Sequence, residues 1–165
     1  TKDIYGVFYI RLSRKKAEQI YMAGSTFEIG KANTLREGRD ATIIASGICV
    51  ADACRVADKL AKEGIHVRVL DMFTIKPIDK DAIIKASKET GAIVTVENHN
   101  ILNGLGSAVA EVLSEEAPCR MKRLGVPDRF GEVGTIPFLK EKYHMAEKDI
   151  EEAVKSLISK KDVTQ

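Results

Sequence analysis

The side chains best suited to chemistry gather in the tetrapeptide ENHN, where Glu97, Asn98, His99 and Asn100 end an apolar run. That run, AIVTVEN, is expected to be a buried strand, and ligands of open α/β sheets bind outside the carboxyl ends of the strands. The imidazole of His99 titrates near neutral pH, so it could carry protons or bind a phosphate. Because no serine or cysteine is spaced to complete a nucleophilic triad with it, we favour an interface or structural role for His99.

A glycine-rich turn follows in NGLGSAVAE, where Gly104 and Gly106 open a predicted helix directly after a strand. The start of a helix attracts anions, so a phosphate or dinucleotide site is one interpretation. The dinucleotide fingerprint lacks its third glycine here, and the turn follows the third predicted strand instead of the first. Close packing of the helix against the sheet is therefore the favoured interpretation.

A second polar loop, GVPDRFGEVG, carries Asp128, Arg129 and Glu132. Ion pairs that pin this loop are the favoured interpretation, and binding of a phosphate or carboxylate by the Arg129 guanidinium is the alternative. The other histidines, His66 and His144, are expected at the surface or at the ends of elements. No spacing of histidines or carboxylates indicates a metal site.

The composition excludes several classes of partner. Lys and Arg number 26 against 24 Asp and Glu, and both signs are interspersed, so no basic patch suits a nucleic acid. Aromatic residues make up 5% of the chain and Trp is absent, which leaves few platforms on which bases could stack. The three cysteines lack a CxxC spacing and are expected to be reduced thiols of a cytoplasmic protein. No apolar run is long enough to span a membrane.

From residue 41 onward, apolar runs typical of strands alternate with helical patterns. Strands are expected over residues 41–50, 65–73, 92–98 and, as a half-exposed or edge strand, 119–127. Their spacing of roughly 25 residues fits a strand plus a crossover helix. One such helix should begin at Asp79 or Asp81, and another near Ala146. The pattern predicts an α/β fold with three layers, α/β/α, around a mostly parallel sheet.

The first forty residues do not follow this rhythm. GVFYIRLSR begins like a strand and ends in charge, and the stretch after it resembles a connector. We predict that residues 1–13 form the last strand of a domain otherwise missing, that residues 14–40 form a linker with short extended segments, and that residues 41–165 form the α/β domain. Because the chain starts at Thr1 and not at Met, a piece of a longer protein is expected.

Five segments, in this order, resemble the C-terminal portion of the transketolase family. They are GVFYIRLSR, TFEIGKANTLREGRDATIIASG, RVLDMFTIKPID, VTVENHNILNGLGSAVAE and GVPDRFGEVG, and together they cover nearly the whole chain. Asn103 stands where a glycine is expected, a departure that a turn tolerates. The last two segments are most similar to the transketolase made as two separate polypeptides.

The resemblance implies a transferase of the pentose phosphate pathway that moves a two-carbon ketol unit between sugar phosphates. The complete enzyme would hold thiamine diphosphate and Mg2+ through a GDG…N motif, which is absent from this sequence. The resemblance therefore implies that this chain contributes no catalytic, cofactor-binding or metal-binding residue and is inactive alone. Its implied role is assembly with a cofactor-binding N-terminal subunit or domains into a dimer, with residues 97–106 and 125–134 facing the missing pyrimidine domain.

Three alternatives stay open at this point. The same domain occurs in deoxyxylulose-phosphate synthase and in the beta subunit of 2-oxo acid dehydrogenases, which also use thiamine diphosphate. A free-standing nucleotide-binding module would use the GLGSAV turn. A regulatory or interaction domain would have no catalytic partner at all.

Overall fold

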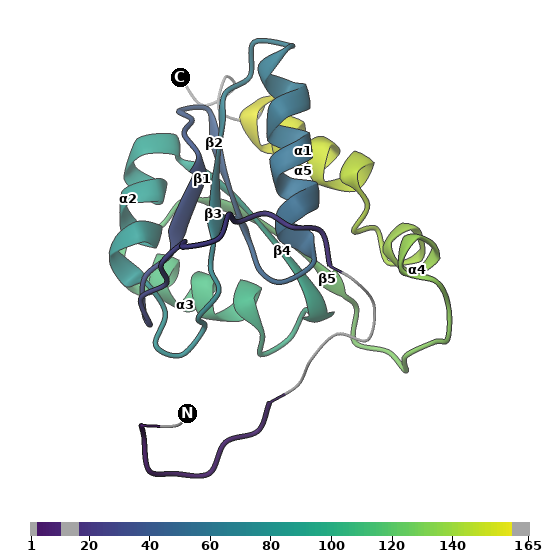
Figure 1. The fold of residues 1–165 in the computed structure, drawn as a ribbon. Coiled ribbons are helices and arrows are strands. Elements are labelled where there is room, and N and C mark those ends of the chain that lie inside the picture. The colour runs from purple at the N-terminus through teal and green to yellow at the C-terminus, as the bar shows by residue number, and fades with distance from the viewer. Residues whose placement is uncertain (1–2, 11–16, 160–165) are drawn as a thin grey trace.

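The computed structural model describes residues 3–10 and 17–159 of the chain, and Figure 1 shows a sheet covered by helices on both faces. The strands are β1 (Asn33–Arg36), β2 (Ala41–Ala45), β3 (Val67–Asp71), β4 (Ala92–Asn100) and β5 (Arg120–Val126). The helices are α1 (Cys49–Ala61), α2 (Lys80–Thr90), α3 (Leu105–Glu116), α4 (Ile136–Lys142) and α5 (Glu147–Ser159). The three-layer α/β architecture predicted from the sequence is thus confirmed.

The strands lie in the order β1-β3-β2-β4-β5. Strands β3, β2, β4 and β5 are parallel, and β1 pairs antiparallel with β3 at one edge. Strand β5 forms the other edge, as its mixed polar and apolar composition predicted. Because four strands are parallel, their carboxyl ends meet at one edge of the sheet, and the loops that follow them lie close together.

Two apolar cores hold the layers together, one on each face of the sheet. The first lies between the sheet and helices α1 and α5, where Val56, Leu60, Ile150 and Val154 are fully buried. The second lies under α2 and α3 and includes Ile83. Burial of such aliphatic side chains contributes about 1.5–3 kcal/mol each, so these faces fix which way the helices pack.

Helix α2 shows how local chemistry sets the bounds of an element. Asp79 is its N-cap, and its carboxylate accepts hydrogen bonds from the backbone N–H of Ala82 at 3.0 Å and of Ala32 at 2.8 Å. Gly91 ends the helix with φ of 61°, a left-handed conformation that costs little only for glycine. Of the two candidates for the helix start, the structure therefore selects Asp79 over Asp81.

Several predicted boundaries were wrong. The strand expected over residues 41–50 stops at Ala45, because Gly47 turns the chain and α1 begins at Cys49. The strand expected over residues 65–73 is shorter, and β4 runs two residues past Asn98. Strand β1 lies within residues 14–40, where a linker with short extended segments was expected, and it pairs with β3 of the α/β domain. Helix α4 was not predicted.

Residues 3–10 form no strand, and their large apolar side chains, Tyr5, Val7 and Tyr9 among them, are exposed. Figure 1 shows this segment apart from the sheet, in dark purple. Residues 1–2 and 11–13, which belong to the same predicted strand of a neighbouring domain, lie outside the described residues. None of the helices in the described part of the chain is long and apolar enough to cross a membrane.

Candidate functional site

The structure brings together two of the segments that the sequence singled out, at the carboxyl edge of the sheet. Strands β4 and β5 are neighbours, so the loops that follow them run side by side. The side-chain amide of Asn100 donates a hydrogen bond to Asp128 at 3.0 Å, and the N–H of Ile101 donates to the Val126 carbonyl at 2.8 Å. Residues 98–104, which comprise the end of β4 and the loop after it, and residues 127–135 therefore form one surface, and we call these two segments the paired loops.

Glu97 lies beneath this surface and has a structural task. Its side chain is 2% exposed, and its carboxylate accepts hydrogen bonds from the N–H groups of Leu105 and Gly106, each at 2.7 Å. The carboxylate thus meets the positive end of α3, where a negative charge is stabilised. A Cβ atom on Gly104 would lie 2.0 Å from a Glu97 carboxylate oxygen, so glycine at this position is needed to admit the side chain.

This arrangement decides between the two interpretations of the glycine-rich turn. The N–H groups that would hold a phosphate already donate to Glu97, and a second anion there would face its charge. A Cβ atom on Gly106 would also lie 2.9 Å from the Thr95 hydroxyl oxygen. The glycines thus serve close packing of helix, strand and carboxylate, and the turn is not shaped for a nucleotide.

The exposed residues of the paired loops carry the remaining polar groups predicted for the site. Asn98 and His99 are exposed, and Nδ1 of His99 lies 3.0 Å from the Asn100 carbonyl oxygen. Arg129 is also exposed, and its backbone N–H donates to the Pro127 carbonyl at 2.7 Å. His99 and Arg129 thus present their side chains to solvent.

Ion pairing in the second loop takes a different route from the one expected. Glu132 pairs with Lys142 of α4 at 2.5 Å, so the loop is pinned to a helix that the sequence did not reveal. Phe130 and Val133 in the same loop are 98% and 101% exposed. Large apolar side chains that point into solvent from a polar loop are typical of an interaction surface.

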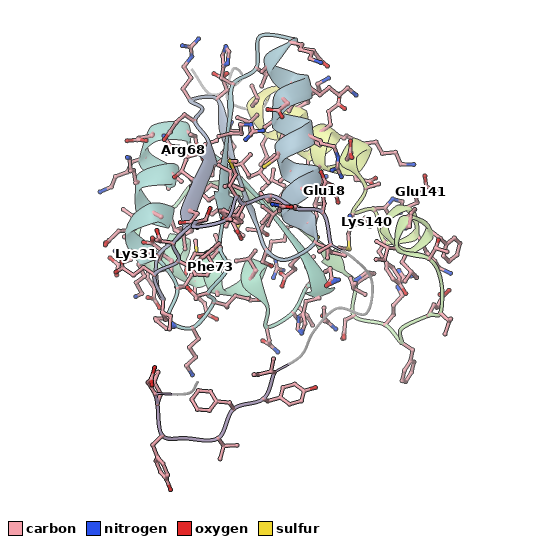
Figure 2. The ribbon with its side chains drawn as sticks, viewed as in Figure 1. Glu18, Lys31, Arg68, Phe73, Lys140 and Glu141 are labelled. Atoms are coloured by element: carbon pink, nitrogen blue, oxygen red, sulfur yellow. The ribbon has the colours of Figure 1, made fainter. Side chains whose placement is uncertain are left out.

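A charged cluster beside α4 was also missed at the level of sequence. Asp52 is 4% exposed, and its carboxylate binds both Lys140 and Arg55. Arg55 also binds Glu18 and Glu147. Figure 2 shows Glu18 and Lys140 on the same side of the molecule, where these pairs fasten α4 and the chain near residue 18 to α1. The sequence feature that could have indicated this cluster is Asp52, a carboxylate within the apolar stretch that begins α1.

Tyr21 contacts the buried Asp71 at the carboxyl end of β3. The Tyr21 hydroxyl donates to the Asp71 carboxylate at 2.7 Å, and Asn33 donates to the same hydroxyl at 3.3 Å. Burial raises the pKa of Tyr21 to about 12, helped by the hydrogen bond to Asp71. Tyr21 stacks edge-on against Phe27, which stacks in turn against Phe73, so this cluster fixes the chain that precedes β1.

The cysteines of the described residues are not activated thiols. Burial raises the pKa of the Cys49 thiol to about 12 and also raises that of Cys54, so both are protonated at neutral pH. All three cysteines are free thiols. Over residues 3–10 and 17–159, no group of three His, Cys, Asp or Glu side chains is placed to hold a metal ion.

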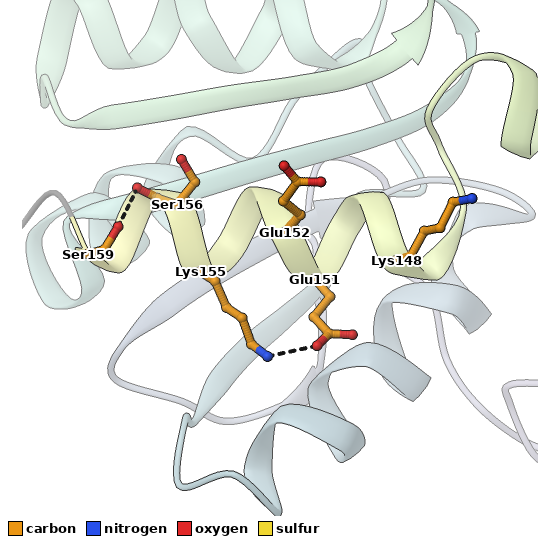
Figure 3. Close-up of a pocket in the computed structure, with 6 residues that line it drawn as sticks. All are labelled: Lys148, Glu151, Glu152, Lys155, Ser156 and Ser159. Atoms are coloured by element: carbon orange, nitrogen blue, oxygen red, sulfur yellow. Dashed lines mark hydrogen bonds and ion pairs between the residues drawn. The ribbon is translucent and has the colours of Figure 1, made fainter.

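A broad depression of about 600 Å³ lies along α5 (Figure 3). Its lining comes from α5 alone and is charged or hydroxylated, with Lys155 bound to Glu151 at 2.8 Å and Ser159 donating to the Ser156 carbonyl at 3.2 Å. Polar groups do not converge on it from several elements, as they do in catalytic clefts. The paired loops thus remain the candidate functional surface.

The described residues thus form a three-layer α/β domain with a mostly parallel sheet, whose glycine-rich turn packs on a buried glutamate next to a polar DRFGE loop. Residues 30–150 match the family model described as the transketolase C-terminal domain. This chain belongs to the transketolase family, and the match falls on its C-terminal domain.

Similar proteins support the same assignment. The chain is 45% identical, over 157 residues, to a 6-deoxy-6-sulfo-D-fructose transketolase subunit of Clostridium sp. (strain MSTE9). The aligned region covers 95% of this chain and 49% of the relative. It is 46% identical, over 121 residues, to an apulose-4-phosphate transketolase subunit of Phocaeicola vulgatus, covering 73% of this chain and 38% of the relative. The chain spans about half the length, or less, of these curated relatives.

Among solved structures, a split-gene transketolase described as an inactive beta4 tetramer superposes with a TM-score of 0.84 at 43% identity. The superposition covers 88% of this chain and 48% of that one. Several of these similar proteins are subunits of split transketolases. They favour assigning this chain to the C-terminal domain of a transketolase and not to the same domain of another thiamine diphosphate enzyme.

The cofactor of this family does not fit the described residues. A diphosphate with its metal needs carboxylate ligands and free N–H donors. The one glycine-rich helix start predicted as an anion site is filled by the Glu97 carboxylate, and no metal-binding group of side chains occurs among the described residues. We therefore assign the described residues no role in a reaction step of thiamine diphosphate.

Proposed function

We propose that this chain is the assembly domain of a transketolase made as two polypeptides. The complete enzyme transfers a two-carbon ketol unit between sugar phosphates in the cytoplasm. Thiamine diphosphate and Mg2+ bind to other domains, and this domain alone is inactive. The relatives described above are named for 6-deoxy-6-sulfo-D-fructose and for apulose-4-phosphate, so the substrate need not be a sugar of the pentose phosphate pathway.

The observation that carries the proposal is the surface made by the paired loops. It lies at the carboxyl edge of the sheet and combines exposed His99 and Arg129 with the exposed aromatic ring of Phe130. Arg and aromatic residues are enriched at the centres of protein interfaces. The hydrogen bond between Asn100 and Asp128 holds the two loops in one arrangement before a partner arrives.

The exposed segment over residues 3–10 supports the same proposal. Its apolar side chains, Ile4, Val7 and Ile10 among them, have few contacts of their own in this chain. We propose that residues 1–13 complete a sheet of the pyrimidine domain, that residues 14–40 lead from it to the α/β domain, and that the cofactor-binding subunit and a second copy of this subunit are the partners. A free-standing nucleotide-binding module is not favoured, because Glu97 fills its site.

The test is reconstitution of the enzyme from its two subunits. The natural subunit that contains this chain is mixed with the cofactor-binding subunit, thiamine diphosphate and Mg2+, and ketol transfer from a ketose phosphate is followed. We expect activity only from the mixture. Full activity from either subunit alone would contradict the proposal.

Two pairs of variants locate the surface. His99→Ala and Arg129→Ala should each lower reconstituted activity at limiting subunit concentration by about tenfold, the effect of losing about 1.4 kcal/mol of association free energy. His66→Ala and Arg39→Ala change the same residue types at exposed positions near the amino edge of the sheet and should leave activity unchanged. Equal effects from both pairs would contradict a docking role for the paired loops.

A further inference from the structure

A groove of about 460 Å³ lies between the loop after β3 and helix α3. One wall is formed by residues 75–78 of that loop together with Lys80 at the start of α2, and the other is formed by residues of α3 between 107 and 115. Asn103 and Gly104 also line the groove, so it adjoins the paired loops. Figure 1 shows the loop after β3 beside α3. Unlike the depression along α5, this groove is built by elements that are far apart in the chain.

The two walls of the groove carry opposite charges. Lys76 and Lys80 line the wall next to β3, and Glu111 and Glu115 line the wall made by α3. All four side chains are exposed, and within residues 3–10 and 17–159 none of them takes part in an ion pair. The groove therefore offers one basic and one acidic wall, and a partner that presents the same charges in reverse order would satisfy both.

Two of these charges stand at helix ends where the helix itself disfavours them. Lys80 is the first residue of α2, and Glu115 lies in the last turn of α3. The start of a helix carries a partial positive charge and its end a partial negative charge, so each of these side chains lowers the stability of its own helix. Local stability does not explain either charge, whereas a partner that supplies the opposite charges does.

Exposed apolar side chains border the basic wall. Ile75 lines the groove and is 40% exposed, and Ile29 is 72% exposed. Ile29 lies close to this wall, because a Cβ atom on the adjacent Gly30 would lie 3.2 Å from Cγ of Pro77. Apolar surface beside a charged groove is removed from water when a protein covers it, and a small ion would leave it exposed. The occupant that fits the groove is therefore a protein surface.

We propose that this groove is the contact between two copies of this subunit related by a two-fold axis. Such an axis uses the same surface on both copies, so the basic wall of each copy faces the acidic wall of the other. Lys80 of one copy then lies opposite Glu115 of the other, and the same pair forms a second time across the axis. The inference rests on the second copy proposed above as a partner, and it assigns that copy a place on the domain.

The test is self-association of the natural subunit without the cofactor-binding subunit, measured by sedimentation equilibrium. Lys80→Glu brings two carboxylates together at each proposed pair, and Glu115→Lys brings two ammonium groups together. Each variant alone should dimerise at least about tenfold more weakly than the parent subunit, because like charges meet twice in the contact. Both reversals suit the helix ends at which they stand, so the variants should fold as stably as the parent.

An equimolar mixture of the two variants provides the decisive comparison. In a mixed dimer one pair keeps its original signs and the other has them exchanged, so both pairs are attractive again. The mixture should therefore form mixed dimers with most of the parent's affinity. The control variants Lys62→Glu and Glu152→Lys make the same changes at exposed positions outside the groove and should leave self-association unchanged.

Three results would overturn the proposal. The parent subunit could stay monomeric, or the reversals could leave its self-association unchanged, or they could weaken it with no recovery in the mixture. Weaker binding of the cofactor-binding subunit with unchanged self-association would assign the groove to that subunit and also overturn the proposal. Because self-association is measured on one subunit alone, its outcome is separate from that of the reconstitution of ketol transfer.

Discussion

The carboxylate of Glu97 carries a negative charge in a buried position, held there by two backbone N–H groups at the start of α3. Glu97→Gln keeps the shape but removes the charge and turns an N–H group toward one of these donors. Hydrogen bonds to charged groups contribute about 1.5–3 kcal/mol each, so the free energy of unfolding should fall by about 1–3 kcal/mol. Urea denaturation measures this difference.

The control for Glu97 is Glu111→Gln, which makes the same change at an exposed position on α3. Surface substitutions usually change stability by less than about 0.5 kcal/mol. If both variants lie within that range of the parent protein, Glu97 does not hold the helix start as the geometry indicates.

Asp71 makes stability depend on pH. Burial raises the pKa of its carboxyl, while the hydrogen bond from Tyr21 lowers it. The folded protein thus keeps this proton to higher pH than the unfolded chain does. Its stabilising contribution is complete below the unfolded pKa of about 3.9 and is lost as pH rises through the folded value. Asp71→Asn cannot ionise, so its free energy of unfolding should rise relative to the parent as pH increases from about 3 to 7.

Asp58 provides a control of opposite sign for this measurement. The hydrogen bond from Arg36 lowers the pKa of Asp58, so its stabilising contribution is present above the unfolded pKa and is lost as pH falls. Asp58→Asn should therefore lose stability relative to the parent as pH rises over the same range. Parallel pH profiles for the two variants, measured by urea denaturation, would rule out this assignment of the two carboxyls.

At the scale of elements, α2 depends on its cap. Asp79→Ala removes an acceptor shared by Ala82 of the helix and Ala32 of the chain before β1. We expect a loss of about 1–2 kcal/mol in the free energy of unfolding, typical for an N-cap carboxylate. Asp81→Ala, two residues later and exposed, is the matched control and should cost less than about 0.5 kcal/mol. Thermal and urea unfolding of both variants would reveal the contrast, and equal losses would contradict it.

The sequence predicted most of the helices and strands, but it did not disclose helix α4 or the bounds of strand β1. Apolar patterns predicted helices α1, α3 and α5 and three buried strands. The apolar face of each helix repeats over several turns, and each of these strands is a short apolar run. Strand β1 has only four residues and none of them is fully buried, and no residue of α4 is fully buried. Neither element therefore shows a long apolar pattern in the sequence. The apolar run over residues 41–50 crosses a turn, and hydrophobicity alone cannot mark where a strand ends and a helix begins.

The sequence singled out the residues of the candidate surface but not the contacts among them. Asn100 and Asp128 lie far apart in the chain, and their hydrogen bond requires β4 and β5 to be neighbours, which the strand order alone settles. The partner of Glu97 was hidden for the same reason, since the strand must place its carboxylate under the start of α3. The pairing of Glu132 with Lys142 needed a helix that the sequence did not disclose.

At the scale of the whole molecule, the domain presents two unlike edges. The carboxyl edge carries the paired loops with exposed Arg129 and Phe130. At the amino edge, the buried Arg68 pairs with Glu89 at 2.5 Å, while Arg39 and His66 are exposed. An assembly domain that docks through its carboxyl edge should therefore protect one end of the sheet and leave the other unchanged.

Hydrogen–deuterium exchange of the natural subunit, measured with and without the cofactor-binding subunit, tests this directly. We predict slower exchange on complex formation in residues 98–104 and 127–135 and unchanged exchange in residues 37–40 and 62–66 at the amino edge. Complex formation that slows exchange only at the amino edge, with the paired loops unaffected, would contradict docking through the carboxyl edge.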